Sequence, residues 1–218
     1  AWLAGLVVPA AIRSALLPVL GRVRDNPSEH RNELHRATDM CFGLLPYGLF
    51  GGYIIMSVFA PLAFPSAYLD GTHGASAVDV FVILLAGWAF TLLATPTYTS
   101  LMAGHHPWRF TGFIVLVLVA ASLLGYGLVL EGSEEPARKL YSAAVASSLS
   151  AGVLLVLSWW MSGEFDAVQH RKIEWFAVLL GSLVVVVGLF SGTLLWVFGL
   201  PLFWFTKQGW RAIRATSD

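Results

Sequence analysis

The stretch from Val80 to Leu130 constrains this chain more than any other part of the sequence. It contains two apolar runs, 80–103 and 111–130, which are separated by a short polar segment, 104–109. An apolar helix of about 20 residues crosses about 30 Å of hydrocarbon, because each residue adds about 1.5 Å. The polar segment is too short to form a domain and too polar to stay in lipid. The stretch therefore predicts a transmembrane helical hairpin.

The composition places the whole chain in the same class. Of the 218 residues, 57% are hydrophobic and 12% are charged, and so few charges do not cover a water-soluble domain of this size. We expect membrane lipids as partners and no nucleic acid. The single cysteine, Cys41, cannot form an intramolecular disulfide, and we interpret it as a small apolar filler. Because the sequence starts inside an apolar run without signal-peptide features, we interpret it as part of a longer membrane protein.

We predict an all-α fold, a polytopic transmembrane helical bundle of about seven spans that forms one domain over 1–218. The predicted spans cover about 1–20, 41–64, 80–103, 111–130, 140–161, 175–190 and 193–206. An amphipathic helix over about 27–40 is expected to lie on the cytoplasmic membrane surface and lead into the second span. The first span is expected to kink near Pro9 and break near Pro18. The Ala- and Ser-rich run 142–152 predicts a closely packed helix face.

Charge placement sets the predicted topology, because cytoplasmic loops hold most of the Lys and Arg residues. The loop over 22–40 is the most basic, and its arginines are Arg22, Arg24, Arg31 and Arg36. The apolar stretch 175–206 is too long for one span and barely long enough for two. Two crossings with a turn at Ser191-Gly192 put the basic C-terminus on the cytoplasmic side as well. We therefore predict a multi-pass protein of the inner or plasma membrane; Arg138 and Lys139 are the imperfect fit.

The residues that usually carry chemistry form no recognised motif. His30 and His35 are five residues apart in the predicted surface helix, and two more histidines are adjacent in the 104–109 segment. We interpret them as interfacial, with a membrane metalloenzyme as the alternative. Acidic residues occur only in loops and at span ends; Asp79 is interpreted as a helix N-terminal charge, with a functional role as the alternative. We predict no catalytic residue, no metal, no cofactor and no enzymatic activity.

Arg13 is the one charge inside a predicted span. Such a guanidinium either snorkels to the surface or faces a wet cavity, where it can bind a phosphate group bidentately. A second polar feature interrupts the third span beside Pro96, and it comprises Thr95, Thr97, Tyr98, Thr99 and Ser100. These hydroxyl groups either line a water-filled path or bond back to the carbonyl groups of their own helix. Arg13 and this hydroxyl run are the candidate substrate pathway.

The order of several motifs resembles the polysaccharide and lipid-linked oligosaccharide flippases of the multidrug/oligosaccharidyl-lipid/polysaccharide exporter superfamily. The resembling segments are SALLPVLGRVRDNPSEHRNELHRATD, GLLPYGLF, LAFPSAYLDG, SLMAGHHPWR and SAAVASSLS, over about 9–157. Pro18, Pro46, Phe64, Tyr68 and Gly104 stand at the matching positions. The chain departs from the pattern where Pro65 replaces a glycine and where LVLEGSEEPARKLYSAA precedes the Ala-rich span.

The resemblance implies one lobe of a two-bundle transporter, with the N-terminal bundle as the missing partner. It implies alternating-access translocation of a lipid-linked oligosaccharide or polysaccharide precursor, with Pro9, Pro46 and Pro96 as hinges and Arg13 on the substrate. The alternatives are a drug or metabolite exporter of the same superfamily, a membrane-embedded enzyme acting on lipid-linked sugars, and a non-transporting membrane scaffold.

Overall fold

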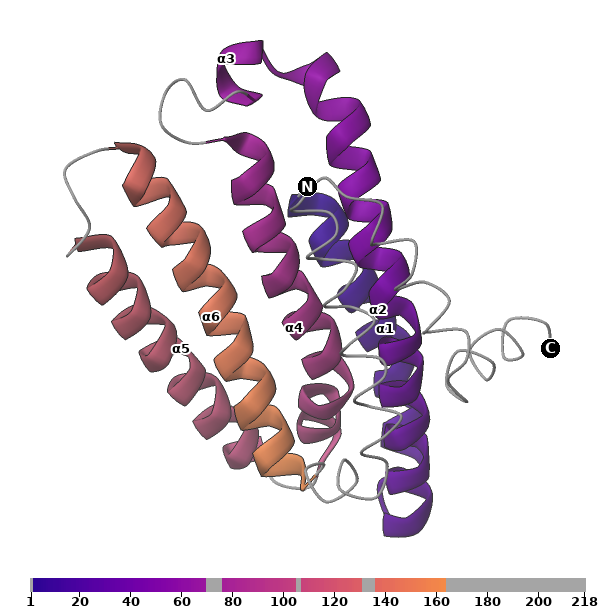
Figure 1. Ribbon diagram of the computed structural model, residues 1–218. Coiled ribbons are helices and arrows are strands. Elements are labelled where there is room, and N and C mark those ends of the chain that lie inside the picture. Colours follow the sequence, from indigo (N-terminus) through magenta and orange to yellow (C-terminus); the bar gives the residue numbers. More distant parts are fainter. Residues whose placement is uncertain (1, 70–75, 105–106, 131–135, 164–218) are drawn as a thin grey trace, which may run out of the picture.

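The computed structural model describes residues 2–69, 76–104, 107–130 and 136–163, and the elements that they form are all helices (Figure 1). The helices are α1 Trp2–Arg22, α2 Pro27–Ala63, α3 Ser66–Leu69, α4 Ala77–Ala103, α5 Pro107–Leu130 and α6 Pro136–Ser162. The predicted spans 175–190 and 193–206 lie outside the described residues. The predicted all-α class is therefore confirmed for the described part of the chain.

Three of the described helices are long and apolar enough to cross a membrane. They are α4 over Ala77–Ala103, α5 over Trp108–Gly127 and α6 over Arg138–Ser162. Their apolar side chains remain largely exposed, because less than a third of each apolar window is buried inside the bundle. Lipid is the solvent in which so much exposed apolar surface is stable. The structure thus supports membrane association, while the predicted total of seven spans stays a prediction.

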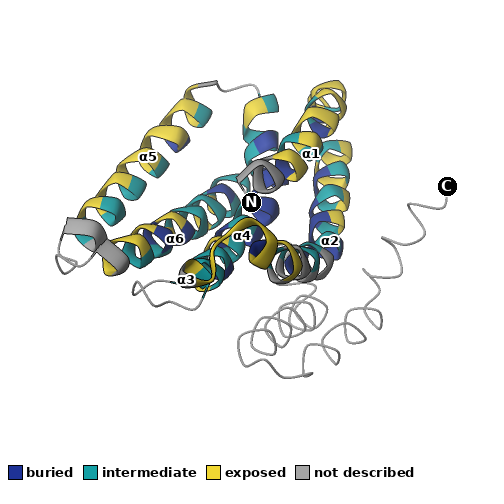
Figure 2. Ribbon diagram, turned by 90° about the horizontal axis from the view of Figure 1, so that it is seen from above, coloured by how far each residue is buried: buried dark blue, intermediate teal, exposed yellow. Residues whose placement is uncertain are grey.

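Helix α4 is the centre of the bundle, with α1 and α2 on one side and α6 on the other (Figure 2). Its contact with α2 forms an apolar core of Cys41, Phe42, Leu45, Leu49, Ala89, Leu92 and Leu93. Cys41 is fully buried in this core, so its interpretation as a small apolar filler agrees with its surroundings.

The expected hairpin of α4 and α5 is a hairpin in sequence but not a packed pair. Helix α5 packs mainly against α6, which lies between α5 and α4 (Figures 1 and 2). Ala144 and Ser148 lie one turn apart on a small-residue face of α6, and both are buried. This face lets α4 approach closely, and Gly87 of α4 lies against Ser148. The prediction of a closely packed face on 142–152 is confirmed, whereas hydropathy alone gave no information on which helix it would meet.

Helix α2 joins two elements that the sequence analysis separated. The predicted amphipathic helix 27–40 and span 41–64 form one continuous helix, which begins at Pro27 and ends at Ala63. Asn26 is its N-cap, and the Asn26 side chain accepts a hydrogen bond from the Glu29 amide. Phe64 is its C-cap. The first half is therefore coaxial with the second and packs along α4 instead of turning onto the membrane surface.

Helix α1 also differs from its expected form, because it does not break near Pro18. It continues through Pro9 and Pro18 to Arg22. A proline removes one backbone donor only, and the last turn still carries a hydrogen bond from the Val23 amide to the Val19 carbonyl.

Candidate functional site

The predicted hydroxyl run lies buried on α4 and bonds largely to its own helix. Thr95 Oγ1 donates to the Thr91 carbonyl at 2.8 Å and Thr99 Oγ1 donates to the Thr95 carbonyl at 2.6 Å. One turn earlier, Thr91 Oγ1 donates to the Gly87 carbonyl at 3.0 Å. The side chains of Thr95, Thr97 and Thr99 are fully buried. Of the two predicted arrangements, this geometry is the one in which the hydroxyl groups bond to carbonyl groups of their own helix beside Pro96. A role of these hydroxyl groups in a substrate pathway stays a prediction.

Thr97 differs from its neighbours because it also bonds to another helix. Its Oγ1 lies 2.9 Å from the Ala94 carbonyl oxygen and 2.8 Å from Ser158 Oγ on α6. Ser158 donates its own proton to the Leu155 carbonyl at 2.9 Å, so Thr97 is the donor in the contact between the helices. Both side chains are buried, and a buried hydrogen bond of this kind fixes the register of α4 against α6.

Ser100 and His30 join α4 to the first turn of α2. His30 Nε2 lies 2.7 Å from Ser100 Oγ, although the two residues are 70 positions apart in the sequence. His30 Nδ1 is buried and has no hydrogen-bond partner in the part of the chain that the structure describes. One ring nitrogen is thus satisfied by α4 and the other is not.

These contacts define what we call the polar end of the bundle: residues 30–39 of α2, 95–100 of α4 and Ser158 of α6. It lies at the end of the bundle where α1, α4 and α6 end and α2 begins (Figure 1). Along α2, Thr38 is buried and donates to the Leu34 carbonyl at 2.8 Å. The continuous α2 helix is the reason for this arrangement, because it carries the charged segment alongside the hydroxyl run of α4.

Arg13 lies at the same level along the bundle as the polar end, but its side chain is on the outside of the bundle. It lies nine residues before the end of α1 and Arg36 lies nine residues after the start of α2, so both stand about 14 Å along their helices from the connecting turn. Arg13 is exposed and flanks the buried row of α1 formed by Pro9, Leu16 and Leu20, whereas Thr95, Thr97 and Thr99 are fully buried. Arg13 and these threonines therefore line no common surface.

The other predicted positions also lie on the described helices. Tyr98 is half-buried on α4, and Pro96 is buried in the same turn. Pro9 is buried on α1, and position 46 lies within α2. The three prolines thus lie inside helices, which is where a hinge of the predicted kind must be; their hinge role stays a prediction.

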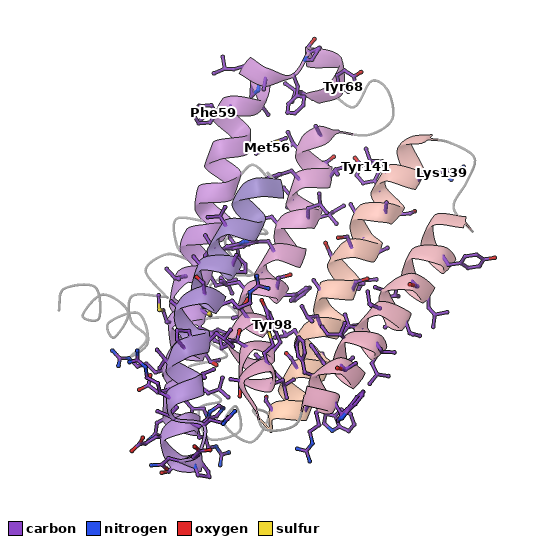
Figure 3. All side chains as sticks on the ribbon, turned by 180° about the vertical axis from the view of Figure 1, so that it is seen from behind. Met56, Phe59, Tyr68, Tyr98, Lys139 and Tyr141 are labelled. Carbon is purple, nitrogen blue, oxygen red and sulfur yellow. The ribbon has the colours of Figure 1, made fainter. Side chains whose placement is uncertain are left out.

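The opposite end of α4 is fastened to α6 by a tyrosine (Figure 3). The Tyr141 hydroxyl accepts a hydrogen bond from the Ser76 amide at 3.2 Å and donates one to Asp79 Oδ2 at 3.1 Å. Ser76 is the N-cap of α4 and Asp79 lies in its first turn, where a carboxylate is favourable to the helix dipole. The placement of Asp79 at a helix N-terminus is confirmed, and Tyr141 adds a cap supplied by another helix.

The described residues contain no group of three or more His, Cys, Asp or Glu side chains that could hold a metal ion. Comparison of the chain with protein-family models, with curated proteins and with solved structures finds no match.

Sequence reasoning missed three residues that fasten the helices together, namely His30, Tyr141 and Ser158. Each pairs with a group more than 60 positions away, and no local pattern indicates such a partner.

Proposed function

We propose that this chain is a multi-pass membrane protein, with the α1–α2 and α4–α5 connections on the cytoplasmic side. The spacing of aromatic residues near the helix ends supports this placement. On α5, Trp108 and Tyr126 are 83% and 71% exposed and are about 27 Å apart along the helix. On α6, Tyr141 and the exposed Trp160 are about 28 Å apart. These spacings fit aromatic belts at the two surfaces of one bilayer.

We further propose that the protein translocates an amphiphilic, phosphate-bearing lipid such as a lipid-linked saccharide. The observation that carries this proposal is the polar end of an otherwise apolar bundle. There, the hydroxyl run of α4 lies beside the charged segment of α2, and Arg13 stands at the same height on α1. A guanidinium group at that depth is stable where it reaches water or binds an anionic group. Arg13 is exposed at this height and is the group that binds the lipid phosphate.

A substitution series at Arg13 in the full-length protein tests the proposal. The assay follows a fluorescent lipid-linked oligosaccharide across reconstituted vesicles. A charged hydrogen bond contributes about 1.5–3 kcal/mol, so Arg13→Ala is expected to weaken substrate affinity roughly 10- to 100-fold. Arg13→Lys is expected to recover only part of the loss, because an ammonium group cannot bind bidentately.

The matched control is Arg22→Ala, which removes an exposed arginine at the end of the same helix. This variant is expected to transport as the wild type does. Wild-type translocation by Arg13→Ala would remove Arg13 from the mechanism. Equal losses in both variants would show that only the overall positive charge matters.

A second candidate function is a non-transporting scaffold, and one observation favours it. The hydroxyls of Thr95 and Thr99 already bond within α4, so they need no substrate or water. The same reconstitution separates the two functions, because a scaffold gives no translocation of any lipid tested while remaining folded. An exporter of drugs or metabolites would instead move soluble probes but not the lipid-linked saccharide.

A further inference from the structure

Helices α4 and α6 are joined by side-chain hydrogen bonds along their whole length. The contacts are Tyr141 to Asp79, Ser148 Oγ to the Ile83 carbonyl at 2.6 Å, Thr97 to Ser158, and Trp159 Nε1 to the Leu93 carbonyl at 3.5 Å. Hydrogen bonds are directional, so four of them spread over about five turns fix both the register and the angle of the pair. Helix α5 packs on α6 and completes the same unit.

The contact of α2 with α4 is of another kind. Over most of its length it is apolar, and it includes two glycines placed under large side chains, Gly48 under Trp88 and Gly52 under Leu85. The glycines leave room in the α2 surface for Trp88 and Leu85, and apolar contact of this kind adds no directional bond between the two helices. His30 to Ser100 is a side-chain hydrogen bond between these two helices, and it lies at the polar end.

This hydrogen bond leaves the imidazole half-satisfied. His30 Nε2 is bonded to Ser100 Oγ, but the buried Nδ1 has no partner among the described residues. A buried nitrogen without a partner carries a desolvation cost. If α2 moves away from α4, water reaches both nitrogens and removes this cost, which offsets the loss of the Ser100 bond. The His30–Ser100 contact is therefore a weaker fastening than one in which both ring nitrogens are satisfied.

We propose that α4, α5 and α6 form one rigid unit, that α2 moves against it, and that His30 and Ser100 are the latch that holds the polar end closed. Opening the latch exposes the polar end to the aqueous side. This inference concerns the moving parts of the bundle and holds whether the protein carries a lipid or a soluble compound.

Distances between spin labels in lipid nanodiscs test the proposal, with the full-length protein and Cys41→Ala as the background. One label pair spans the latch, at Arg31 on α2 and Met102 on α4. The reference pair lies within the rigid unit, at Leu84 on α4 and Leu149 on α6. All four positions are exposed, so the labels replace no packed side chain.

The test variant is Ser100→Ala, which removes the latch hydroxyl, and the control is Thr91→Val, whose hydroxyl bonds within α4. Ser100→Ala is expected to increase the population of longer distances across the latch and to leave the distance of the reference pair unchanged. Thr91→Val is expected to leave both distances as they are in the wild type. An unchanged latch distance would overturn the proposal. Equal broadening of both pairs would also overturn it, because the bundle would then loosen as a whole.

Discussion

Replacing Gly87 by alanine tests the closest approach between α4 and α6. A Cβ atom at position 87 would lie 2.8 Å from Ser148 Oγ, 3.0 Å from Ser148 Cα and 3.3 Å from Ser148 Cβ. Because Cα belongs to the backbone, a side-chain rotation cannot relieve the clash and α6 has to move. Overpacking of this kind costs about 1–3 kcal/mol. The movement also weakens the 2.6 Å bond from Ser148 to the Ile83 carbonyl, which contributes about 0.5–1.5 kcal/mol.

Alanine has a better helix propensity than glycine by up to about 1 kcal/mol, and this gain offsets part of the loss. We therefore expect Gly87→Ala to lower the free energy of unfolding by about 1–3 kcal/mol, which is roughly a 5- to 150-fold change in the unfolding equilibrium. The assay is reversible unfolding in mixed micelles by increasing sodium dodecyl sulfate, followed by circular dichroism.

The matched control is Gly125→Ala on α5, where a Cβ atom meets nothing within 4 Å. This variant is expected to be as stable as the wild type or slightly more so. If Gly87→Ala unfolds at the same detergent fraction as Gly125→Ala, the close packing of α4 on α6 is refuted.

Two further substitutions test the contacts between these helices. Tyr141→Phe removes the hydroxyl that bridges Ser76 and Asp79; it should lower the free energy of unfolding by about 0.5–1.5 kcal/mol in the same assay, and an unchanged stability would contradict the bridge. Thr97→Val keeps the shape of the side chain but removes the hydrogen bond to Ser158. The expected loss in the free energy of unfolding is about 0.6 kcal/mol and at most about 1.7 kcal/mol. A loss of similar size in the Ser158→Ala, Thr97→Val double variant would show that the two hydroxyls act as a pair.

The helices could be predicted from the sequence more accurately than their ends. The apolar pattern predicted that one span starts at 111, whereas helix α5 begins at Pro107. It predicted that another span starts at 140, whereas helix α6 begins at Pro136. The missed signal is proline at the first helical position, where its absent amide proton costs nothing. The helix expected over about 27–40 does begin at Pro27, which is also a proline at the first helical position. Boundaries were wrong where the apolar pattern was followed instead of the backbone chemistry.

The packing of the helices could not be predicted from hydropathy. An apolar run gives the length of a span but says nothing about its neighbours, so the insertion of α6 between α4 and α5 was missed. The small residues of α6 did predict a closely packed face, although not that Gly87 of α4 would meet Ser148. The pairing of His30 with Ser100 requires α2 to be one continuous helix. That continuity could have been predicted, because residues 28–40 contain no proline or glycine that would end a helix.

The central claim is that lipid surrounds this bundle, with its two ends on opposite sides of one membrane. The most direct test uses a cysteine-free background, Cys41→Ala, and single cysteines introduced as Asp25→Cys, Gly104→Cys and Ser66→Cys. Asp25 and Gly104 lie in the α1–α2 and α4–α5 connections, and Ser66 begins α3 at the other end (Figure 1). We predict that a membrane-impermeant maleimide added outside intact cells labels position 66 and reaches positions 25 and 104 only after the membrane is opened. Labelling of all three positions in intact cells, or of none but 25 and 104, would contradict the account.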